Sequence, residues 1–200
     1  MSERRPNILL ITADQHNADI LGCYGNPVVQ TPNIDRLADA GVRFTHAFTP
    51  FSLCSPARTS IMTGQWAHHH GVTYNVNMGR EVPGLASNMP VITKILKSVG
   101  YSTALIGKRH MLMEGVPDMH FDYQVLAEGK GQFTAHHRPD DYHDYLHQKG
   151  YGDEWKTWET VQYQRDFWVT LPFPEEDYID TFIGRRAVEY LNETAEEPFF

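Results

Sequence analysis

The sequence predicts an α/β fold with a mainly parallel central sheet flanked by helices. The first observation is a continuous apolar run, Pro6–Asp14, which is typical of a buried parallel strand. The second is that such runs alternate with amphipathic helical segments, as expected when crossover helices join parallel strands. The third is the length, because 200 residues suffice for one ordinary domain or a large part of a bigger one.

Hydrophobic periodicity and turn residues divide the chain into alternating elements. Asn33 is the expected cap of the first helix and Gly41 closes it. Pro56 stands in the first turn of the second helix, where proline is tolerated, and that helix begins at Cys54 or Ser55. The expected strands are 6–14, 42–48, 101–108 and 121–129, with another starting in 196–200, and the expected helices are 34–41, 54–64, 89–100 and 177–194.

Residues 115–175 have a different composition from the rest of the chain. They contain Trp155, Trp158 and Trp168, many tyrosines and histidines, and little periodicity. Three tryptophans so close together are costly to expose, so they must pack on something. We predict a long excursion from the sheet, which either shapes substrate access or forms a hydrophobic cover over the sheet.

Composition limits the possible partners and the compartment. The formal net charge of −8 argues against a nucleic-acid or anionic-membrane surface, since both require a basic patch. Cys23 and Cys54 are too few for a disulfide framework. The N-terminal apolar run is too short for a secretory signal or a membrane helix, so the expected location is cytoplasmic.

Two groups of polar residues follow predicted strands, where ligands bind in α/β folds. Asp14 and Gln15 follow the first strand, and their oxygens suit a hard divalent cation. The alternative is an acid that merely ends a strand beside a turn. Lys108 and His110 follow the third strand, two residues apart, so both could face one side. The alternative for this pair is a solvated basic turn.

Cys54 lies at the start of a predicted helix, where negative charge is stabilised. Arg58 follows one turn later and could reach back toward it. This arrangement suits an oxyanion or a reactive nucleophile, although a cysteine that only packs would fit the same spacing. His68–His70 cannot all bind one ion, but one of them could point into the site.

Three motifs in order resemble the sulfatase family of the alkaline-phosphatase superfamily. Cys54–Arg58 reads Cys-Ser-Pro-Ala-Arg and is followed by Met62–Gly64, similar to the first signature of that family. The run GYSTALIGKRH at 100–110 resembles its second signature, and the segments at 6–15 and 31–48 resemble its usual opening. The similarity covers residues 6–111 and, more loosely, the helix leading to 196–200.

The resemblance implies an unusual nucleophile at Cys54. In the family, a maturation enzyme oxidises this cysteine to formylglycine, which is then hydrated to a gem-diol. One hydroxyl attacks the sulfur of a sulfate ester and the alcohol leaves. The second hydroxyl then loses its proton, sulfate is expelled and the aldehyde returns, so that covalent catalysis is divided into two easier steps.

The resemblance also assigns roles to other residues. It makes Asp14, Gln15 and the modified Cys54 ligands of one divalent metal, with calcium expected and magnesium or manganese as alternatives. Arg58 would hold the formylglycine. Lys108 would contact sulfate and neutralise charge in the transition state.

The same resemblance gives one histidine a catalytic role and makes another a candidate for substrate binding. His110 would hydrogen-bond the diol and help to remove its proton. His70 matches a frequent histidine of the family and is a candidate substrate-binding residue. The expected partners are a small-molecule sulfate ester and the formylglycine-generating enzyme, without nucleic acid or membrane.

Gln15 departs from many sulfatases, which have aspartate at this position. Glutamine here is similar to choline sulfatases and phosphonate monoester hydrolases, but the latter generally lack the Lys-x-His that this chain keeps. We therefore expect a sulfuric ester hydrolase. The alternatives are a phosphonate monoester or phosphodiester hydrolase of the same superfamily, and a non-catalytic protein that binds oxyanions. We also expect residues 1–200 to form the N-terminal part of a larger catalytic domain.

Overall fold

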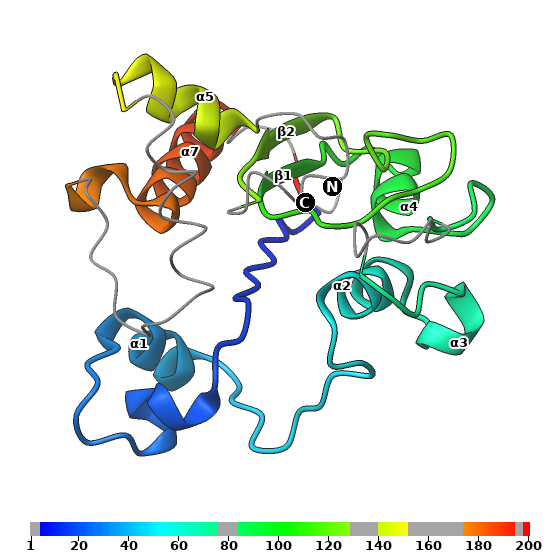
Figure 1. The fold of residues 1–200 in the computed structure, drawn as a ribbon. Helices are drawn as coiled ribbons and strands as arrows, with labels where there is room; N and C mark the ends of the chain where they lie inside the picture. Colours follow the sequence, from blue (N-terminus) through cyan, green and yellow to red (C-terminus); the bar gives the residue numbers. More distant parts are fainter. Residues whose placement is uncertain (1–4, 76–83, 129–139, 152–173, 195–197) are drawn as a thin grey trace. The chain divides into compact units, whose positions relative to one another are not determined.

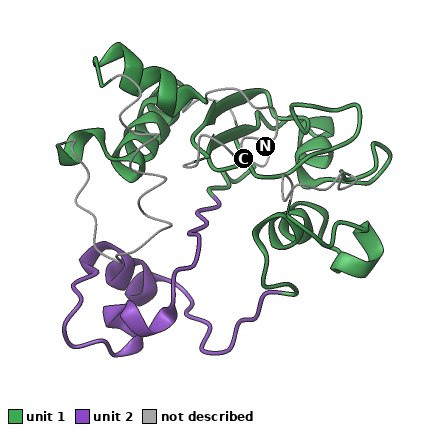
Figure 2. Ribbon diagram, viewed as in Figure 1, with its two compact units in different colours: residues 1–9, 50–200 green, residues 10–49 purple. Residues whose placement is uncertain are grey.

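The chain divides into two compact units in a computed structural model. The structure describes residues 5–75, 84–128, 140–151, 174–194 and 198–200. Residues 1–9 and 50–200 make up unit 1, and residues 10–49 make up unit 2 (Figure 2). Unit 1 holds the sheet and most of the helices, whereas unit 2 holds two single 3-10 turns and one helix.

A parallel pair of strands lies in unit 1, as the sequence predicts. Strand β1 (Ala104–Gly107) pairs with β2 (Tyr123–Leu126) (Figure 1). In the register of this pair, Ala104 lies opposite Tyr123. Both strands fall within the predicted ranges 101–108 and 121–129 but are shorter. The parallel pairing and the flanking helices confirm the α/β class, although in the described residues the sheet has only these two strands.

The C-terminal residues pair beside β1 in the same parallel direction. The amide of Phe200 donates to the Ser102 carbonyl at 2.9 Å, and the amide of Ala104 donates to the Phe200 carbonyl at 2.8 Å. Phe199 in turn accepts a hydrogen bond from the amide of Ile8 at 2.8 Å. Residues 198–200 therefore pair with the chain beside β1 through an isolated parallel bridge, where the sequence predicts the start of an additional strand, and the N-terminal segment bonds to Phe199.

Helices flank this sheet and carry the candidate site. The helix that begins at Cys54, the helix near residue 92 and the long helix after residue 177 were all expected, whereas the helix that starts at 141 was not. Among the described residues of unit 1 the helices are α2 (Cys54–Thr63), α3 (Ala67–His70), α4 (Ile92–Ser98), α5 (Asp141–Gln148) and α7 (Ile179–Glu193), with a 3-10 turn, η3, at Glu175–Asp177.

Two apolar clusters hold unit 1 together. Helix α5 packs on β2 and α7 packs on β1, so residues of both helices and of β2 share one cluster (Figure 1). The other cluster is rich in methionine, whose flexible side chain fills irregular space. The first cluster contains Val125, Ala127, Tyr142, Leu146 and Phe182, and the second contains Met62, Val72, Leu85, Val91, Met111, Met113, Met119 and Phe121.

The predicted strands at 6–14 and 42–48 are wrong for this structure. Neither range is assigned to a strand, and Ile11 and Phe44 are 75% and 69% exposed. The cause is pairing, because an apolar run becomes a strand only where another backbone accepts its hydrogen bonds. Ile8 finds such a partner in Phe199, and the chain passes into unit 2 at Leu10.

Unit 2 is organised around a carboxylate instead of a sheet. Its helix α1 (Pro32–Ala40) begins one residue before Asn33, so the predicted cap is wrong: proline occupies the first turn and Thr31 is the flanking residue. The Asp35 carboxylate accepts hydrogen bonds from the Cys23 amide at 2.7 Å and the Thr31 hydroxyl at 2.9 Å. These bonds tie α1 to the turns η1 (Ala18–Ile20) and η2 (Gly22–Tyr24).

The aromatic excursion is described only in part. The gaps at 129–139 and 152–173 place Trp155, Trp158 and Trp168 outside the described residues. Within the part that is described, β2 and α5 belong to the packed body of unit 1 and not to a segment away from the sheet. None of the described helices is long and apolar enough to cross a membrane.

A buried carboxylate joins α5 to the start of α7. Asp177 is 1% exposed and accepts hydrogen bonds from the hydroxyls of Tyr145 and Tyr151, the second at 2.6 Å. The Lys149 ammonium lies 3.3 Å from the same carboxylate, and the Asp177 carbonyl accepts from the Tyr142 hydroxyl at 2.9 Å. One side chain therefore joins α5 and the residues that follow it to the start of α7.

Replacing Asp177 with alanine should lower the free energy of unfolding by about 2 kcal/mol, since two tyrosine hydroxyls lose a charged acceptor. Hydrogen bonds from Tyr145 and Tyr151 lower the pKa of Asp177. The stabilisation is therefore present above the unfolded carboxyl pKa of about 3.9 and is lost as pH falls through the lower folded-state pKa. Urea unfolding over a pH series measures both effects. Asp144→Ala, an exposed position on α5, is the matched control and should change little.

Candidate functional site

Cys54 is the first residue of α2. The sequence predicted that this helix begins at Cys54 or at Ser55. The residue before it, Leu53, has an extended backbone and offers no side-chain cap. The amide of Ser55 is instead capped from outside, by Asn75 Oδ1 at 2.9 Å. Asn75 was not singled out from the sequence, because a cap that arrives from twenty residues downstream leaves no local spacing pattern. The cap fixes the turn of α2 that carries Cys54.

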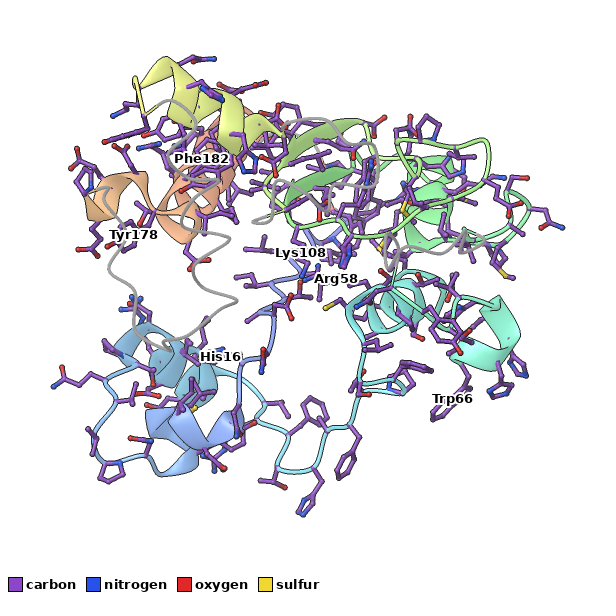
Figure 3. The ribbon with its side chains drawn as sticks, in the orientation of Figure 1. His16, Arg58, Trp66, Lys108, Tyr178 and Phe182 are labelled. Atoms are coloured by element: carbon purple, nitrogen blue, oxygen red, sulfur yellow. The ribbon has the colours of Figure 1, made fainter. Side chains whose placement is uncertain are left out.

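Lys108 meets Cys54 across unit 1. Its Nζ lies 3.8 Å from Cys54 Sγ, although 54 residues separate the two in the sequence. Arg58 Nη1 donates to the Lys108 carbonyl at 2.7 Å, so the same helix also holds the backbone of that residue (Figure 3). Three of the predicted site residues thus lie close together. Cys54 is the nucleophile position, Lys108 is the cation, and Arg58 joins the two segments that carry them.

Lys108 and His110 were expected to face one side because side chains two residues apart in a strand share a face. The loop after β1 does not keep this strand geometry. Strand β1 ends at Gly107, whose φ is 119°, and His110 has a φ of 45°. A positive φ is uncommon for a non-glycine residue and turns the chain sharply. The prediction that strand geometry sets these two side chains is therefore wrong, because residues 108–110 lie beyond the end of β1.

Arg109, between the two predicted site residues, anchors this loop. It is 5% exposed, and its Nη1 donates to the Pro117 carbonyl at 2.7 Å and to Gln124 Oε1 at 3.1 Å. Burial lowers the pKa of Arg109, while the nearby carboxylates of Glu128 and Asp118 raise it. The guanidinium remains charged under ordinary conditions.

Glu128 was not recognised in the sequence as a site residue. It follows β2, and its Oε1 accepts hydrogen bonds from two consecutive amides, Arg109 at 3.1 Å and His110 at 3.0 Å. A single carboxylate therefore defines the backbone path between Lys108 and His110. No sequence signal marks it, since a glutamate eighteen residues downstream of His110 reaches the loop only because β1 and β2 are neighbours.

His70 lies in unit 1 but is enclosed. It is 4% exposed, its Nδ1 accepts from the Val72 amide at 3.1 Å, and its Nε2 lies 2.9 Å from Ser60 Oγ. Since Nδ1 accepts a hydrogen bond, the proton resides on Nε2 and is directed at the serine. This geometry favours a structural role between α3 and α2, and substrate contact by His70 stays a prediction.

Protein stability should fall at mildly acidic pH because of His70. Burial lowers the pKa of His70, so the folded state binds a proton less readily than the unfolded state. The free energy of unfolding is therefore expected to decrease as pH falls below the unfolded value of about 6.5 toward the lower folded-state pKa. Thermal unfolding at several pH values measures this slope. His70→Gln should reduce the slope, whereas His69→Gln, an exposed neighbour, should retain it.

Asp14 and Gln15 belong to unit 2, whereas the residues above belong to unit 1. They form a turn with exposed side chains, and Gln15 has a φ of 53°. Their carboxylate and amide oxygens are the donor type that hard divalent cations prefer. Among the described residues, no group of three or more histidine, cysteine, aspartate or glutamate side chains could hold a metal ion. A metal centre that unites Asp14, Gln15 and Cys54 stays a prediction.

Comparison with known proteins agrees with the motifs. The Sulfatase family profile matches residues 6–200. The chain is 31% identical over 172 residues to N-acetylglucosamine-6-O-sulfatase of Bacteroides thetaiotaomicron, covering 85% of this chain and 29% of that protein. It is 44% identical over 135 residues to arylsulfatase H of Canis lupus familiaris, covering 64% and 24%. The chain thus spans less than a third of the length of these relatives.

Two solved structures are also similar to the chain. One described as BT4656 in complex with D-Glucosamine-2-N, 6-O-disulfate is 34% identical, with a TM-score of 0.54 over 64% of this chain and 24% of that chain. The phosphonate monoester hydrolase of Agrobacterium radiobacter gives a TM-score of 0.71 over 98% of this chain and 40% of that chain. Its identity is 24%, so this likeness shows the fold alone, which is the alkaline-phosphatase-like α/β fold that the sequence predicts.

Proposed function

The chain belongs to the sulfatase family, and we propose that the protein hydrolyses sulfate esters to an alcohol and inorganic sulfate. The observation that carries the proposal is the approach of Lys108 Nζ to Cys54 Sγ at 3.8 Å, at the N-terminus of a helix. An ammonium group and a helix N-terminus together stabilise an anionic group beside the nucleophile position.

Each candidate residue of unit 1 has its own role in the proposed reaction. Formylglycine at position 54, formed by a maturation enzyme, supplies a hydrated aldehyde as a nucleophile that can release sulfate without a second attack at sulfur. Lys108 binds the sulfate oxygens and neutralises the charge that develops on them. Arg58 holds the formylglycine, as the resemblance implies, and its bond to the Lys108 carbonyl holds the backbone of that residue near α2. His110 moves a proton at the hydroxyls of residue 54.

A divalent metal completes the proposed site. Asp14 and Gln15 would hold it through oxygen, and residue 54 would add a further oxygen once oxidised. Calcium suits such a set of hard donors, with magnesium or manganese as alternatives. The metal would supply positive charge to polarise the sulfate group. Gln15 contributes no charge, so the site carries one negative charge fewer than a pair of aspartates would.

The choice of sulfate over phosphonate rests on Lys108 and His110. The resemblance associates this pair with sulfatases, and the approach of Lys108 to Cys54 supports its use in binding an oxyanion. The alcohol part of the substrate stays open: the relatives are named for an amino sugar sulfate and for aryl sulfates, which differ widely in shape.

A direct assay separates the candidate functions. The whole protein, produced with a formylglycine-generating enzyme, is incubated with nitrophenyl sulfate and with an aryl phosphonate monoester, with and without added calcium. Preferential release of inorganic sulfate supports the proposal, and preferential cleavage of the phosphonate supports the alternative hydrolase. Binding of inorganic sulfate without any turnover, together with an intact thiol at Cys54, would indicate an oxyanion-binding protein.

A further inference from the structure

The amides that follow Lys108 converge on one oxygen. Glu128 Oε1 accepts from Arg109 at 3.1 Å and from His110 at 3.0 Å. His110 is held with a φ of 45°, a conformation that a residue with a Cβ rarely adopts unless its surroundings maintain it. An anionic acceptor that receives two successive N–H groups provides such support, because hydrogen bonds to a charged group are stronger than those between neutral groups.

The backbone of Glu128 is held by the residue that caps the N-terminus of α5. Its amide donates to Asp140 Oδ2 at 2.5 Å, and Asp140 is 5% exposed. The other oxygen of Asp140 accepts from the His143 amide at 3.0 Å and contacts the His143 ring Nδ1 at 2.5 Å. A buried carboxylate that caps α5 therefore also positions the residue that supports the active-site loop.

The neighbouring bonds fix Glu128 in register with the sheet. The amide of Ala127 donates to the Gly107 carbonyl at 3.1 Å, on the side of β1, while the amide of Leu126 donates to Asp141 Oδ2 at 2.6 Å. Alternate backbone groups of a strand point to opposite edges, so β1 takes one edge of this segment and the first turn of α5 takes the other. The backbone of residues 126–128 is thereby anchored at both edges.

We infer that Glu128 is a positioning residue for the reaction: it holds the positive-φ backbone at His110 and so sets the direction of the imidazole. This inference rests on the proposed function, in which both side chains act on the sulfate ester. Glu128 acts through the two amides and takes no part in bond making or breaking. Without its carboxylate, the turn is expected to relax toward an ordinary backbone conformation and to carry the imidazole away from its working position.

The test compares three variants of the whole protein. Glu128→Ala removes the acceptor, Glu128→Gln retains an oxygen that can accept both amides, and Glu114→Ala alters an exposed glutamate of the same unit as a control. On nitrophenyl sulfate, Glu128→Ala should lower kcat by roughly 100-fold with KM changed by less than about threefold, since misplaced catalytic groups cost about this much. Glu128→Gln should recover most of the rate, and the control should match the wild type.

Hydrogen exchange provides a second readout that does not require turnover. Amides in a peptide covering residues 108–111 should exchange at least about tenfold faster in Glu128→Ala than in Glu128→Gln, while peptides from α7 stay unchanged. If the wild type hydrolyses no sulfate ester, the proposed function fails, and the exchange data still decide whether Glu128 holds the turn. Unchanged exchange at 108–111 would overturn the inference. So would a general loss of protection throughout unit 1, which indicates a structural role only.

Discussion

Cys54→Ala is expected to abolish sulfate ester hydrolysis while the protein keeps its fold. Removal of a covalent nucleophile commonly costs about 10⁴-fold or more in kcat. The side chain is half-buried at the start of α2, and the cap from Asn75 to the Ser55 amide does not involve it. The loss should therefore appear in kcat, with little change in thermal unfolding. Cys23→Ala, the other cysteine of the chain, is the matched control and should retain full activity.

Cys54→Ser extends this test to the second step of the reaction. Serine has one hydroxyl and can attack sulfur, but it has no second hydroxyl with which to expel sulfate. A sulfated enzyme should accumulate, visible as one added sulfuryl group in the peptide that spans residue 54. Peptide mass spectrometry of the wild type should in turn show that the thiol has been lost. An unmodified thiol in fully active protein would contradict both the modification and the proposed mechanism.

Lys108→Ala should lower kcat by roughly 10²–10³-fold, the usual cost of removing one charge-stabilising group from an active site. The backbone of residue 108 should stay in place, because Arg58 holds its carbonyl and Glu128 holds the two amides that follow. The variant therefore removes the ammonium charge without displacing the loop.

Steady-state kinetics on nitrophenyl sulfate measures this effect, and two further variants define its origin. Lys94→Ala, at an exposed position on α4, should behave as the wild type. Arg58→Ala should be at least as damaging as Lys108→Ala, since it releases the whole loop from α2. If Lys108→Ala retains its kcat, the ammonium contributes no charge stabilisation and the assignment of Lys108 is wrong.

In unit 1, the elements that could be predicted are those whose sequence pattern depends on residues close together in the chain. The helices at α2 and α7 follow from periodicity and from the proline in the first turn of α2. Strands β1 and β2 lie within two predicted strand ranges, but the residues that join them contain no helix, so the tertiary structure decided their parallel pairing. Helix α5 was missed because its apolar residues, such as Leu146, are few among charged and aromatic ones.

The sequence by itself determined the chemistry of the candidate site: a cysteine and an arginine one turn apart, a Lys-x-His, and an Asp-Gln pair. These residues belong to short sequence motifs, and the resemblance to sulfatases depends on such motifs and not on contacts between distant residues. Only the tertiary structure decided that Lys108 meets Cys54, that Asn75 caps α2 and that Glu128 supports the His110 turn. Each of these contacts joins residues at least eighteen positions apart. No local pattern encodes such contacts, because they exist only when the parallel strands and α2 pack together.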